Sequence, residues 1–575
     1  MSTDYQSLSF EYRRAREQLE SSESAAGRHP VVVVGAGPVG LATAIDLAQQ
    51  GVSVVLVDDD CTLSSGSRAI CFSKRSLDIF DRLGCGQAMV DKGVRWNVGK
   101  VFLRDQMVYS FDLLPESGHQ RPAFINLQQY YVEGFLLDRA RELPNLEIRW
   151  KNKLAGIEQG SDGATLTVET PEGPYALKAR YVVAADGSRS AVRNLMGLDS
   201  KGRIFKDRFL IADVKMEADF PTERWFWFDP PFHPNQSVLL HRQPDNVWRI
   251  DFQLGWDADP VLEKTRERVI PRVQALLGKD AKFQLEWVSV YTFSCLRMDK
   301  FRHGAVLFAG DSAHGVSPFG ARGANSGIQD AENLAWKLAA VLKGAASEAL
   351  LDSYAEEREY AAEENIRNST RSTDFITPKS AVSRLFRNAV LELARRHPFA
   401  RQLVNSGRLS VPAVLHNSSL NTTNGDEFSG QMVPGASCAD APVLGANVEV
   451  AADAECAQLW LLPELGQEFT VLLFCDAKTL RECVDNAVQA VAGAALPVKL
   501  VLVSSDSLPA DMAPSFAGVR LLHDTEGIAA RRYDAAPGTC YLIRPDQHVA
   551  ARWRNVDRTR MQAALQRALG MPSLS

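Results

Sequence analysis

The stretch Val31-Val-Val-Val-Gly35-Ala-Gly37-Pro-Val-Gly40 decides how the first half of this chain folds. Four β-branched residues are typical of a buried strand, and the glycines that follow permit a tight turn into a helix. A second strand is predicted at Val54 to Val57, and Asp58 follows it directly, with Asp59 and Asp60 next to it. This βαβ opening predicts a dinucleotide site. The pyrophosphate would lie at the helix N-terminus and one of these carboxylates, Asp58 first, would bind the ribose.

Composition and charge limit the class of protein. Of the 575 residues, 45% are apolar and 23% are charged, which is ordinary for a folded globular chain. The net charge is −6 and the basic residues form no block, so a nucleic-acid partner is not expected. The longest apolar stretch contains glycines and Asp46, and the first thirty residues are polar. We therefore expect no membrane span, no secretory signal and a cytoplasmic location.

Two further short strands share a pattern with the opening motif. Residues Tyr181 to Ala184 and Ala305 to Ala309 are each followed by a turn that holds an acid and a glycine. Between them, residues 205–298 alternate as strands do and are rich in aromatic side chains, as are residues 95–130. We therefore predict an α/β fold in which a Rossmann-like nucleotide-binding domain is interrupted by a mixed β-sheet domain.

The rest of the chain is predicted to be helical and then to form a separate domain. Apolar positions recur at helical spacing from Ile328 to Val341, and helical stretches continue to about residue 405. Beyond them the predicted order is strand, helix, strand, two adjacent strands and a last helix. The predicted segments are a polar leader (1–30), the nucleotide-binding domain (31–204 and 299–416), the sheet domain (205–298), a linker (417–430) and a C-terminal α/β domain (431–575).

The nine cysteines predict neither a zinc site nor a disulfide framework, because no CxxC pair or histidine cluster accompanies them. The C-terminal domain has the element order of a thioredoxin-like fold, yet its Cys475 is followed three residues later by Lys478. Thiol–disulfide exchange is therefore unavailable to it. We expect this domain to serve structure or contact rather than redox chemistry.

Two motifs follow the predicted strands, and a loop follows the second motif. They are Asp186-Gly187-Ser-Arg189 and Gly310-Asp311-Ser-Ala-His314, and the loop runs from Ser317 to Asn325. With the opening glycine turn, they make the chain resemble the flavin-dependent aromatic hydroxylases of the para-hydroxybenzoate hydroxylase and phenol hydroxylase type, close to the 3-(3-hydroxyphenyl)propionate hydroxylase-like monooxygenases. The C-terminal domain is similar to the thioredoxin-like appendage of phenol hydroxylase relatives, down to Arg544-Pro545-Asp546 between its last strands.

The resemblance implies a non-covalent FAD. Asp311 would bind the ribityl hydroxyls, and the helix after the loop would place its N-terminus at the edge of the flavin ring that becomes negative on reduction. Gln129, or its neighbour Gln128, would lie near the ribityl chain, and Arg68 would meet the phosphates. The cofactor-binding residues implied are Gly35, Gly37, Gly40, Asp58, Arg68, Gln129, Asp186, Gly187, Gly310, Asp311, Gly323, Ala324 and Asn325.

The resemblance also implies the reaction. NADH or NADPH would reduce FAD, oxygen would add at the flavin C4a atom, and the resulting hydroperoxide would deliver a hydroxyl group to an electron-rich ring. A phenol reacts best as its phenolate, so a base or a hydrogen-bond relay should lie near its hydroxyl. A small aromatic substrate and O2 are the expected partners, and a homodimer is left open. The candidate catalytic residues are Pro318 and Gly323 beside the flavin, and Asp229, His233, His241 and Tyr291 in the sheet domain.

Two other functions fit parts of the sequence. Trp225-Phe-Trp227-Phe-Asp-Pro230 superficially resembles the tryptophan-pair motif of flavin halogenases, although an aromatic strand explains it. A binding protein like the Rab GDP-dissociation inhibitors would keep the nucleotide fold without redox work. The motif 310–314 and the loop 317–325 favour the hydroxylase, and His314 is expected to be a packed loop residue. Direct NAD(P)H oxidation would argue against a halogenase, and a colourless protein would favour the binding protein.

Overall fold

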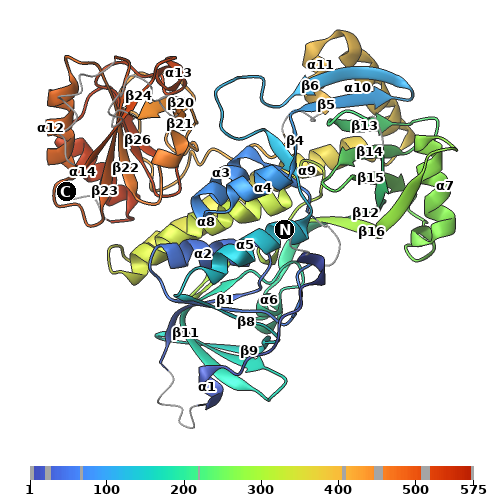
Figure 1. Cartoon of the computed structure of the whole chain (residues 1–575), viewed down its shortest axis with the longest axis horizontal. Coiled ribbons are helices and arrows are strands. Elements are labelled where there is room, and N and C mark those ends of the chain that lie inside the picture. Colours follow the sequence, from blue (N-terminus) through green and yellow to red (C-terminus); the bar gives the residue numbers. More distant parts are fainter. Residues whose placement is uncertain are drawn as a thin grey trace, which may run out of the picture.

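The computed structural model describes residues 5–19, 27–64, 69–217, 220–404, 409–445, 458–506 and 518–571. Figure 1 shows an α/β unit at the bottom of the view, a large mixed sheet at the right, in which only β13 and β5 of the described strands pair in parallel, and the C-terminal unit at the left. The helix α8 (Gly323–Leu342) extends from the middle of the molecule towards the C-terminal unit. No helix within the described ranges is both long and apolar enough to cross a bilayer.

The first sheet has the parallel arrangement of a nucleotide-binding fold. Its main path is β17-β18-β11-β1-β2-β8, and β1 pairs in parallel with both β11 and β2. Residues 31–34 are all buried, as expected for a central strand that is covered on both faces. The strands are β1 (His29–Val34), β2 (Val54–Val57), β8 (Leu146–Arg149), β9 (Lys153–Gly160), β10 (Gly163–Glu169), β11 (Tyr175–Ala184), β17 (Arg302–His303) and β18 (Val306–Phe308).

Helices pack around this sheet, and a small sheet in the order β3-β7-β4 accompanies them. The helix α2 contacts both α5 and α8, so the glycine turn at its start is held from two sides. The elements are η1 (Tyr5–Ser7), α1 (Arg16–Leu19), α2 (Pro38–Gln49), α3 (Lys74–Leu83), α4 (Gly86–Lys92), α5 (Gln129–Arg141), α6 (Ala191–Leu195), η3 (Gly310–Ser312), α9 (Ala349–Ile376), β3 (Cys71–Ser73), β4 (Val94–Trp96) and β7 (Phe124–Asn126).

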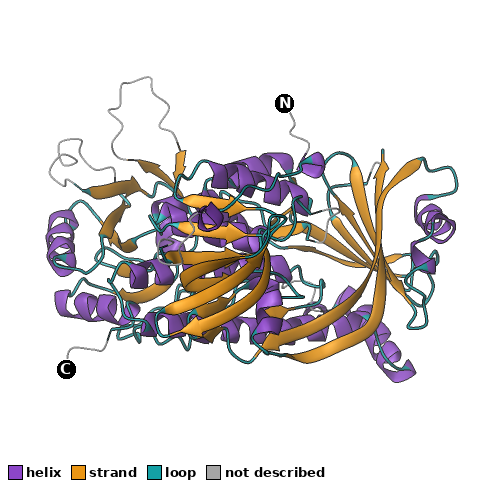
Figure 2. Ribbon diagram, turned by 90° about the horizontal axis from the view of Figure 1, so that it is seen from below, coloured by secondary structure: helices purple, strands orange, loops and turns teal. Residues whose placement is uncertain are grey.

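The second unit is a sheet in the order β19-β16-β12-β15-β14-β13-β5-β6, whose long strands lie at the right of Figure 2. Successive side chains of a strand point to opposite faces. Trp225 and Trp227 therefore pack towards α7, whereas Phe226 and Phe228 pack towards α9 and α10. The elements are β5 (Val98–Leu103), β6 (Gln106–Asp112), β12 (Ser200–Met216), β13 (Arg224–Phe228), β14 (Ser237–Arg242), β15 (Val247–Leu254), η2 (Leu262–Lys264), α7 (Arg266–Leu277), β16 (Phe283–Met298), β19 (His314–Gly315), α10 (Ala381–Arg396) and α11 (Pro398–Val404).

The C-terminal unit is a separate sheet in the order β21-β20-β24-β23-β22-β25-β26. The strands β22, β23 and β24 are parallel, and β25 and β26 add an antiparallel hairpin. The sequence-based order omitted β20, β21, β24 and α13, which are short and lack strong periodicity; the thioredoxin-like assignment stays a prediction. The elements are β20 (Pro442–Gly445), β21 (Gln458–Trp460), η4 (Leu462–Glu464), β22 (Phe469–Cys475), α12 (Leu480–Val491), β23 (Val498–Ser504), β24 (Val519–His523), α13 (Ile528–Arg532), β25 (Cys540–Ile543), β26 (Val549–Trp553) and α14 (Arg558–Ala568).

The thiol of Cys475 supplies a test of the contact role of this unit. It is buried at the end of β22, and burial raises its pKa to about 12, so it stays protonated and unreactive at neutral pH. We predict that Cys475→Ser leaves turnover per bound flavin unchanged, as measured by NAD(P)H oxidation. Cys540→Ser on β25 is the packing control, because that thiol is also buried. A large loss of turnover confined to Cys475→Ser, at equal stability, would contradict the contact role.

Candidate active site

The glycine turn after β1 contains two glycines that the fold requires and one that it does not. Gly35 has a φ of 105°, and an added Cβ would lie 2.5 Å from the carbonyl oxygen of Ala185. An added Cβ on Gly40 would overlap the carbonyl oxygen of Gly35. At Gly37, by contrast, no described atom lies within 4 Å of an added Cβ. This open space at the start of α2 fits the approach of a pyrophosphate to the helix N-terminus.

Asp58 is held against this turn. Its carboxylate accepts hydrogen bonds from the backbone N–H of Ala36 at 2.5 Å and of Asp60 at 2.8 Å, and burial raises its pKa. Asp59 is exposed, and the Asp60 carboxylate is used locally by the N–H of Cys61 at 2.6 Å. The geometry therefore favours Asp58 over its two neighbours as the ribose ligand.

Gln129 braces the segment that leads to Arg68, which itself lies outside the described residues. Its Oε1 accepts the N–H of Ala69 at 3.1 Å, and its Nε2 donates to Glu133 at 2.8 Å. Glu133 in turn accepts the N–H of Ser64 at 2.7 Å. These bonds hold the chain on either side of residues 65–68. The rival Gln128 is buried and donates to the carbonyl oxygen of Pro244 at 3.3 Å, which favours Gln129 as the residue at the cofactor.

The two acid-plus-glycine motifs lie side by side. Arg193, four residues after the first motif, donates to the carbonyl oxygen of Ser312 at 2.7 Å in the second. Asp186 accepts the N–H of Val192 at 3.0 Å, and its other oxygen is buried with no hydrogen-bond partner among the described residues. Gly187 has a φ of 77° and open space where a Cβ would stand. A buried acceptor next to open space fits a hydroxyl-bearing cofactor.

A buried carboxylate that the sequence analysis missed, Asp330 on α8, fixes the second motif. It accepts the N–H of Gly310 at 2.9 Å, contacts His314 Nε2 at 2.6 Å and pairs with Arg358 at 2.6 Å. Burial raises its pKa, but His314 and Arg358 outweigh burial and lower it to about 2. His314 is thus a packed residue, as expected, and Asp311, three residues earlier, is exposed. The sequence did contain a signal for Asp330, because it is an acid within the apolar helical pattern of residues 328–341.

The loop 317–325 is held by α9 on one side and by the end of β3 on the other. Ser317 contacts Thr373 of α9 through their hydroxyls at 2.7 Å, and Arg322 donates to Asn365 of α9 at 2.8 Å. Asn325 accepts the N–H of Ser73 at 2.8 Å, so its side chain serves the loop itself. Its predicted contact with the cofactor therefore depends on its backbone N–H.

The start of α8 leaves room for a flat ring. An added Cβ on Gly323 would meet only Val316 Cγ2, at 3.7 Å, so the glycine is not required by the described protein atoms. The N–H groups of Gly323, Ala324 and Asn325 open the helix and have no intrahelical acceptor. They present the positive end of the helix dipole, which favours an anion or a negatively charged group at this point. Pro318 is exposed in this loop.

A partly open cavity joins this loop to the second sheet. Phe319 and Gly320 of the loop form one wall, and Ser372 and Ile376 of α9 form another. The remaining walls come from the sheet and from the chain near α11. They are Lys100, Val101, Phe111, Arg224, Phe226, Phe228, Val404 and Leu409.

Charged residues gather on the sheet face that lines this cavity. Strand pairing places Arg224, His241, Arg249 and Asp251 on the same face as Phe226. Arg224 is 8% exposed, its Nη1 has no hydrogen-bond partner among the described residues, and burial lowers its pKa. Burial raises the pKa of Asp251 to about 6 and lowers that of His241, whose Nε2 lies 3.7 Å from the Asp251 carboxylate. The face therefore offers a buried guanidinium with an unsatisfied nitrogen, a carboxyl of raised pKa and a neutral imidazole.

The structure brings together only some of the sheet residues predicted from sequence. His241 shares the cavity face, and Tyr291 pairs with Phe209 of that face. Asp229 instead accepts the N–H of Asn235 at 2.7 Å within a hairpin. His233 bonds to the carbonyl oxygen of Gln253 at 2.6 Å and packs on Phe252 of the opposite face, so neither residue reaches the cavity.

Arg224 and Asp251 were missed, although strand alternation carried a signal for one of them. In the run Trp248-Arg-Ile-Asp-Phe252, the two charged residues must share one face and the three apolar residues the other. A charged pair on an otherwise aromatic strand indicates a polar site on that face. The sequence did not show which face meets the flavin loop.

The glycine turn yields a paired test. Gly37→Val should leave the unfolding temperature of the flavin-free protein nearly unchanged, because its Cβ meets open space. It should weaken flavin binding by roughly ten- to hundredfold, the equivalent of losing a hydrogen bond to a charged phosphate at about 1.5–3 kcal/mol. Gly40→Ala, the contrasting variant, should lower the unfolding temperature itself. Flavin fluorescence titration and thermal melts decide, and full retention of flavin by Gly37→Val would refute the assignment.

Comparisons with known proteins agree with this geometry. A family model described as FAD binding domain matches residues 28–369. The 3-(3-hydroxy-phenyl)propionate/3-hydroxycinnamic acid hydroxylase of Mycolicibacterium smegmatis is 30% identical over 386 residues, 66% of this chain and 66% of the relative. The para-nitrophenol 4-monooxygenase of Pseudomonas sp. (strain WBC-3) is 32% identical over 343 residues, 57% of this chain and 82% of the relative.

A solved structure extends the likeness to the C-terminal unit. The flavin-dependent monooxygenase PieE, in complex with FAD and substrate, superposes with a TM-score of 0.78 at 19% identity, over 95% of this chain and 100% of its own. At that identity the likeness shows the fold, whereas the family match and the named relatives show the class. The chain therefore belongs to the FAD binding domain family and is an FAD-dependent monooxygenase of the flavoprotein aromatic hydroxylase type.

Proposed function

We propose that this monooxygenase uses NADH or NADPH and O2 to hydroxylate an aromatic ring that carries negative charge, as a phenolate or through a carboxylate. The observation that carries the proposal is Arg224. It is a buried guanidinium with an unpartnered Nη1 at the wall of an aromatic cavity. Burying a guanidinium with an unsatisfied nitrogen is costly, and an anion bound against that nitrogen would offset the cost.

FAD, when bound, supplies the electron transfer and the activation of O2. The chain would hold it through the open turn at Gly37, the carboxylates of Asp58 and Asp311, and the N-terminus of α8. Arg68 and the nicotinamide co-substrate belong to this proposal. The family match and the named monooxygenases favour the hydroxylase over a halogenase or a GDP-dissociation-inhibitor-like binding protein.

The cavity walls would keep water from the reacting ring. Phe111, Phe226 and Phe319 line it, and aromatic walls both stack on a flat substrate and exclude solvent. Pro318 precedes Phe319 in the loop, and its fixed φ would hold this wall against the cofactor. The catalytic roles proposed for Pro318 and Gly323 are therefore positional.

Asp251 is the group best suited to take the phenolic proton. A general base works best with a pKa near the operating pH, and the pKa of Asp251 is raised to about 6 by burial. Arg224 would then stabilise the phenolate oxygen, and the neutral His241 can relay the proton through its second nitrogen. Tyr291 stays a candidate on the same face, whereas Asp229 and His233 have local structural partners.

Other parts of the proposal concern the setting of the enzyme. The relatives named above act on hydroxyphenylpropionate, hydroxycinnamate and nitrophenol, which supports a small aromatic acid or phenol as substrate. A cytoplasmic location and a homodimer are part of this proposal as well. Gel filtration with light scattering would test the dimer.

Substrate-stimulated oxidation of NADH and NADPH tests the function. Hydroxyphenylpropionates, hydroxybenzoates and nitrophenols should stimulate it and give hydroxylated product, with their neutral esters and methyl ethers as controls. Arg224→Met should raise KM for the anionic compounds by roughly ten- to hundredfold, the equivalent of a charged hydrogen bond of about 1.5–3 kcal/mol. Arg242→Met is the matched control, because Arg242 lies over Trp248 on the opposite face. Equal effects on neutral and anionic compounds would contradict an anion site.

The pH dependence tests the base. With Asp251 as the base, kcat/KM should rise with pH and level off above about pH 6, where the carboxylate is ionised. Asp251→Asn should remove that limb and lower kcat/KM by about 10²–10⁴-fold. Because the pKa of Asp251 is raised on folding, its ionised form costs stability, so Asp251→Asn should not lower stability above pH 6. If the folded variant still lost kcat/KM at low pH in the same way, another group would be the base.

A further inference from the structure

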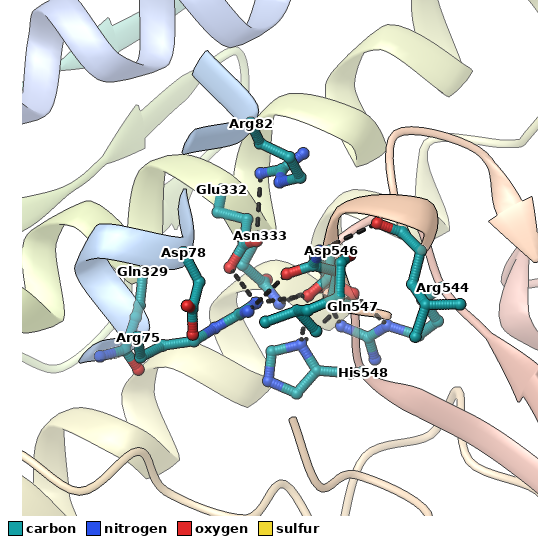
Figure 3. A network of polar contacts seen from close by, with 12 residues as sticks. Arg75, Asp78, Arg82, Gln329, Glu332, Asn333, Arg544, Asp546, Gln547 and His548 are labelled. Atoms are coloured by element: carbon teal, nitrogen blue, oxygen red, sulfur yellow. Dashed lines mark hydrogen bonds and ion pairs between the residues drawn. The ribbon is translucent and has the colours of Figure 1, made fainter. Parts of the chain in front are cut away.

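The loop between β25 and β26 projects from the C-terminal unit and contacts helices of the FAD-binding domain. Its sequence is Arg544-Pro545-Asp546-Gln547-His548, and the side chains of Arg544 and Asp546 are completely buried. Figure 3 shows this loop meeting charged side chains of α3 and α8. The interface between the two domains is therefore built from buried charges at this point.

Arg544 makes a bidentate contact with Glu357 of α9. Its two terminal nitrogens donate to Glu357 at 2.5 and 3.0 Å, and its Nε donates to Asp546 at 3.0 Å. Lys337 of α8 also donates to Glu357, at 2.7 Å. Burial raises the pKa of Glu357, but Arg544 and Lys337 outweigh it and hold the pKa well below its usual range. The carboxylate is therefore charged and fixed between two domains.

The same loop also touches α8 and α3. Asn333 of α8 donates to Asp546 at 3.0 Å and to Glu357 at 2.7 Å. Arg75 of α3 donates to the carbonyl oxygen of Asp546 at 2.7 Å and to Gln547 at 2.7 Å (Figure 3). A five-residue loop thus contacts three helices of the other domain at once.

These three helices carry the active site. Ser76 of α3 and Ser73, the residue just before this helix, donate to Asn325 in the flavin loop. Gly323 begins α8 directly after that loop. Ser372 and Ile376 of α9 line the cavity.

Two adjacent residues of α9 connect the loop to the second flavin motif. Glu357 faces Arg544, and the next residue, Arg358, pairs with Asp330 at 2.6 Å. Asp330 in turn holds the N–H of Gly310. Glu357 and Arg358 thus link the loop, through α9 and Asp330, to the motif that would hold the ribityl chain.

A second contact joins the C-terminal unit to the cavity wall. Arg532 of α13 donates to the carbonyl oxygens of Ser117 and Gly118 at 2.7 and 2.6 Å. Asp440 accepts the N–H of Gln120 at 2.9 Å. Ser117, Gly118 and Gln120 lie on the segment that follows β6, and Phe111 of β6 lines the cavity.

The buried charges at this interface indicate that it fixes the relative positions of the helices, rather than simply holding the two domains together. Buried ion pairs add little net stability, because the cost of removing charges from water offsets their attraction, and apolar residues of similar volume would hold two domains as well. A bidentate guanidinium, however, binds only when both carboxylates stand in the right place. The cluster therefore specifies how α3, α8 and α9 sit relative to one another.

We propose that the loop 544–548 is a positioning element for the flavin loop and the cavity wall, so that the C-terminal unit sets the coupling of the reaction. The coupling part rests on the proposed function. In coupled turnover one atom of O2 enters the ring and the other leaves as water, with two electrons from NAD(P)H. In uncoupled turnover the same two electrons and two protons convert O2 to hydrogen peroxide, and the substrate is unchanged.

Two variants of the full-length enzyme test this inference. Arg544→Lys keeps the charge but cannot hold Glu357 and Asp546 in one fork. Asn333→Ala removes two donors from the same carboxylates without changing any charge, and it decides the question if Arg544→Lys fails to fold. Arg554→Lys is the matched control, since Arg554 pairs with Asp534 at 2.7 Å inside the C-terminal unit.

We expect both test variants to weaken FAD binding by about 2- to 30-fold, the size of effects that single residues exert on a distant ligand site. The visible circular dichroism of the bound flavin should change, and peroxide formed per NAD(P)H should rise. Arg554→Lys should match the parent enzyme in all three. Unchanged FAD affinity, flavin dichroism and peroxide yield in the folded variants would show that the loop only attaches the domain. FAD affinity and dichroism need no substrate, so they test positioning even if no phenol or aromatic acid is hydroxylated.

Discussion

The carboxylate of Asp330 is the interaction on which the arrangement of the site depends. It lies inside the protein and joins three segments that are far apart in sequence: the Gly310 turn, the His314 ring and Arg358 of α9. Its contacts with His314 and Arg358 lower its pKa despite burial, because they outweigh the desolvation of the carboxylate. Removing one partner would leave a buried charge without compensation, which is strongly destabilising. The three segments are therefore expected to take up their positions together.

Side chains alternate along the strands of the second sheet, so its two faces differ in their contacts. The tryptophans of β13 close a packed face under α7, while the phenylalanines point into the cavity. The same alternation places Arg224 and Asp251 on the cavity side. The sheet thus provides both an aromatic wall and a few buried charges on the side that faces the cavity.

The C-terminal unit takes part in the site without contributing a reactive thiol. Its Cys475 is buried and remains protonated, whereas its loop 544–548 contacts the helices that carry the flavin loop. A domain that acts through position leaves little signal in motif searches. Its contribution is visible only as buried charges shared between domains.

The sequence alone determined the α/β class, the FAD-binding motifs and their order, because glycine turns and acidic strand ends require particular residues at fixed local spacing. It predicted Asp58, and it predicted His314 as a packed residue, from neighbours only a few positions away. It did not find Arg224, Asp330 or the contact between Arg544 and Glu357, since their partners come from other strands, helices and domains. It also proposed Asp229 and His233, which the hairpin and the opposite face of the sheet keep from the cavity. Tertiary structure decided these points, because the partner and the burial of a charged side chain depend on how distant segments pack.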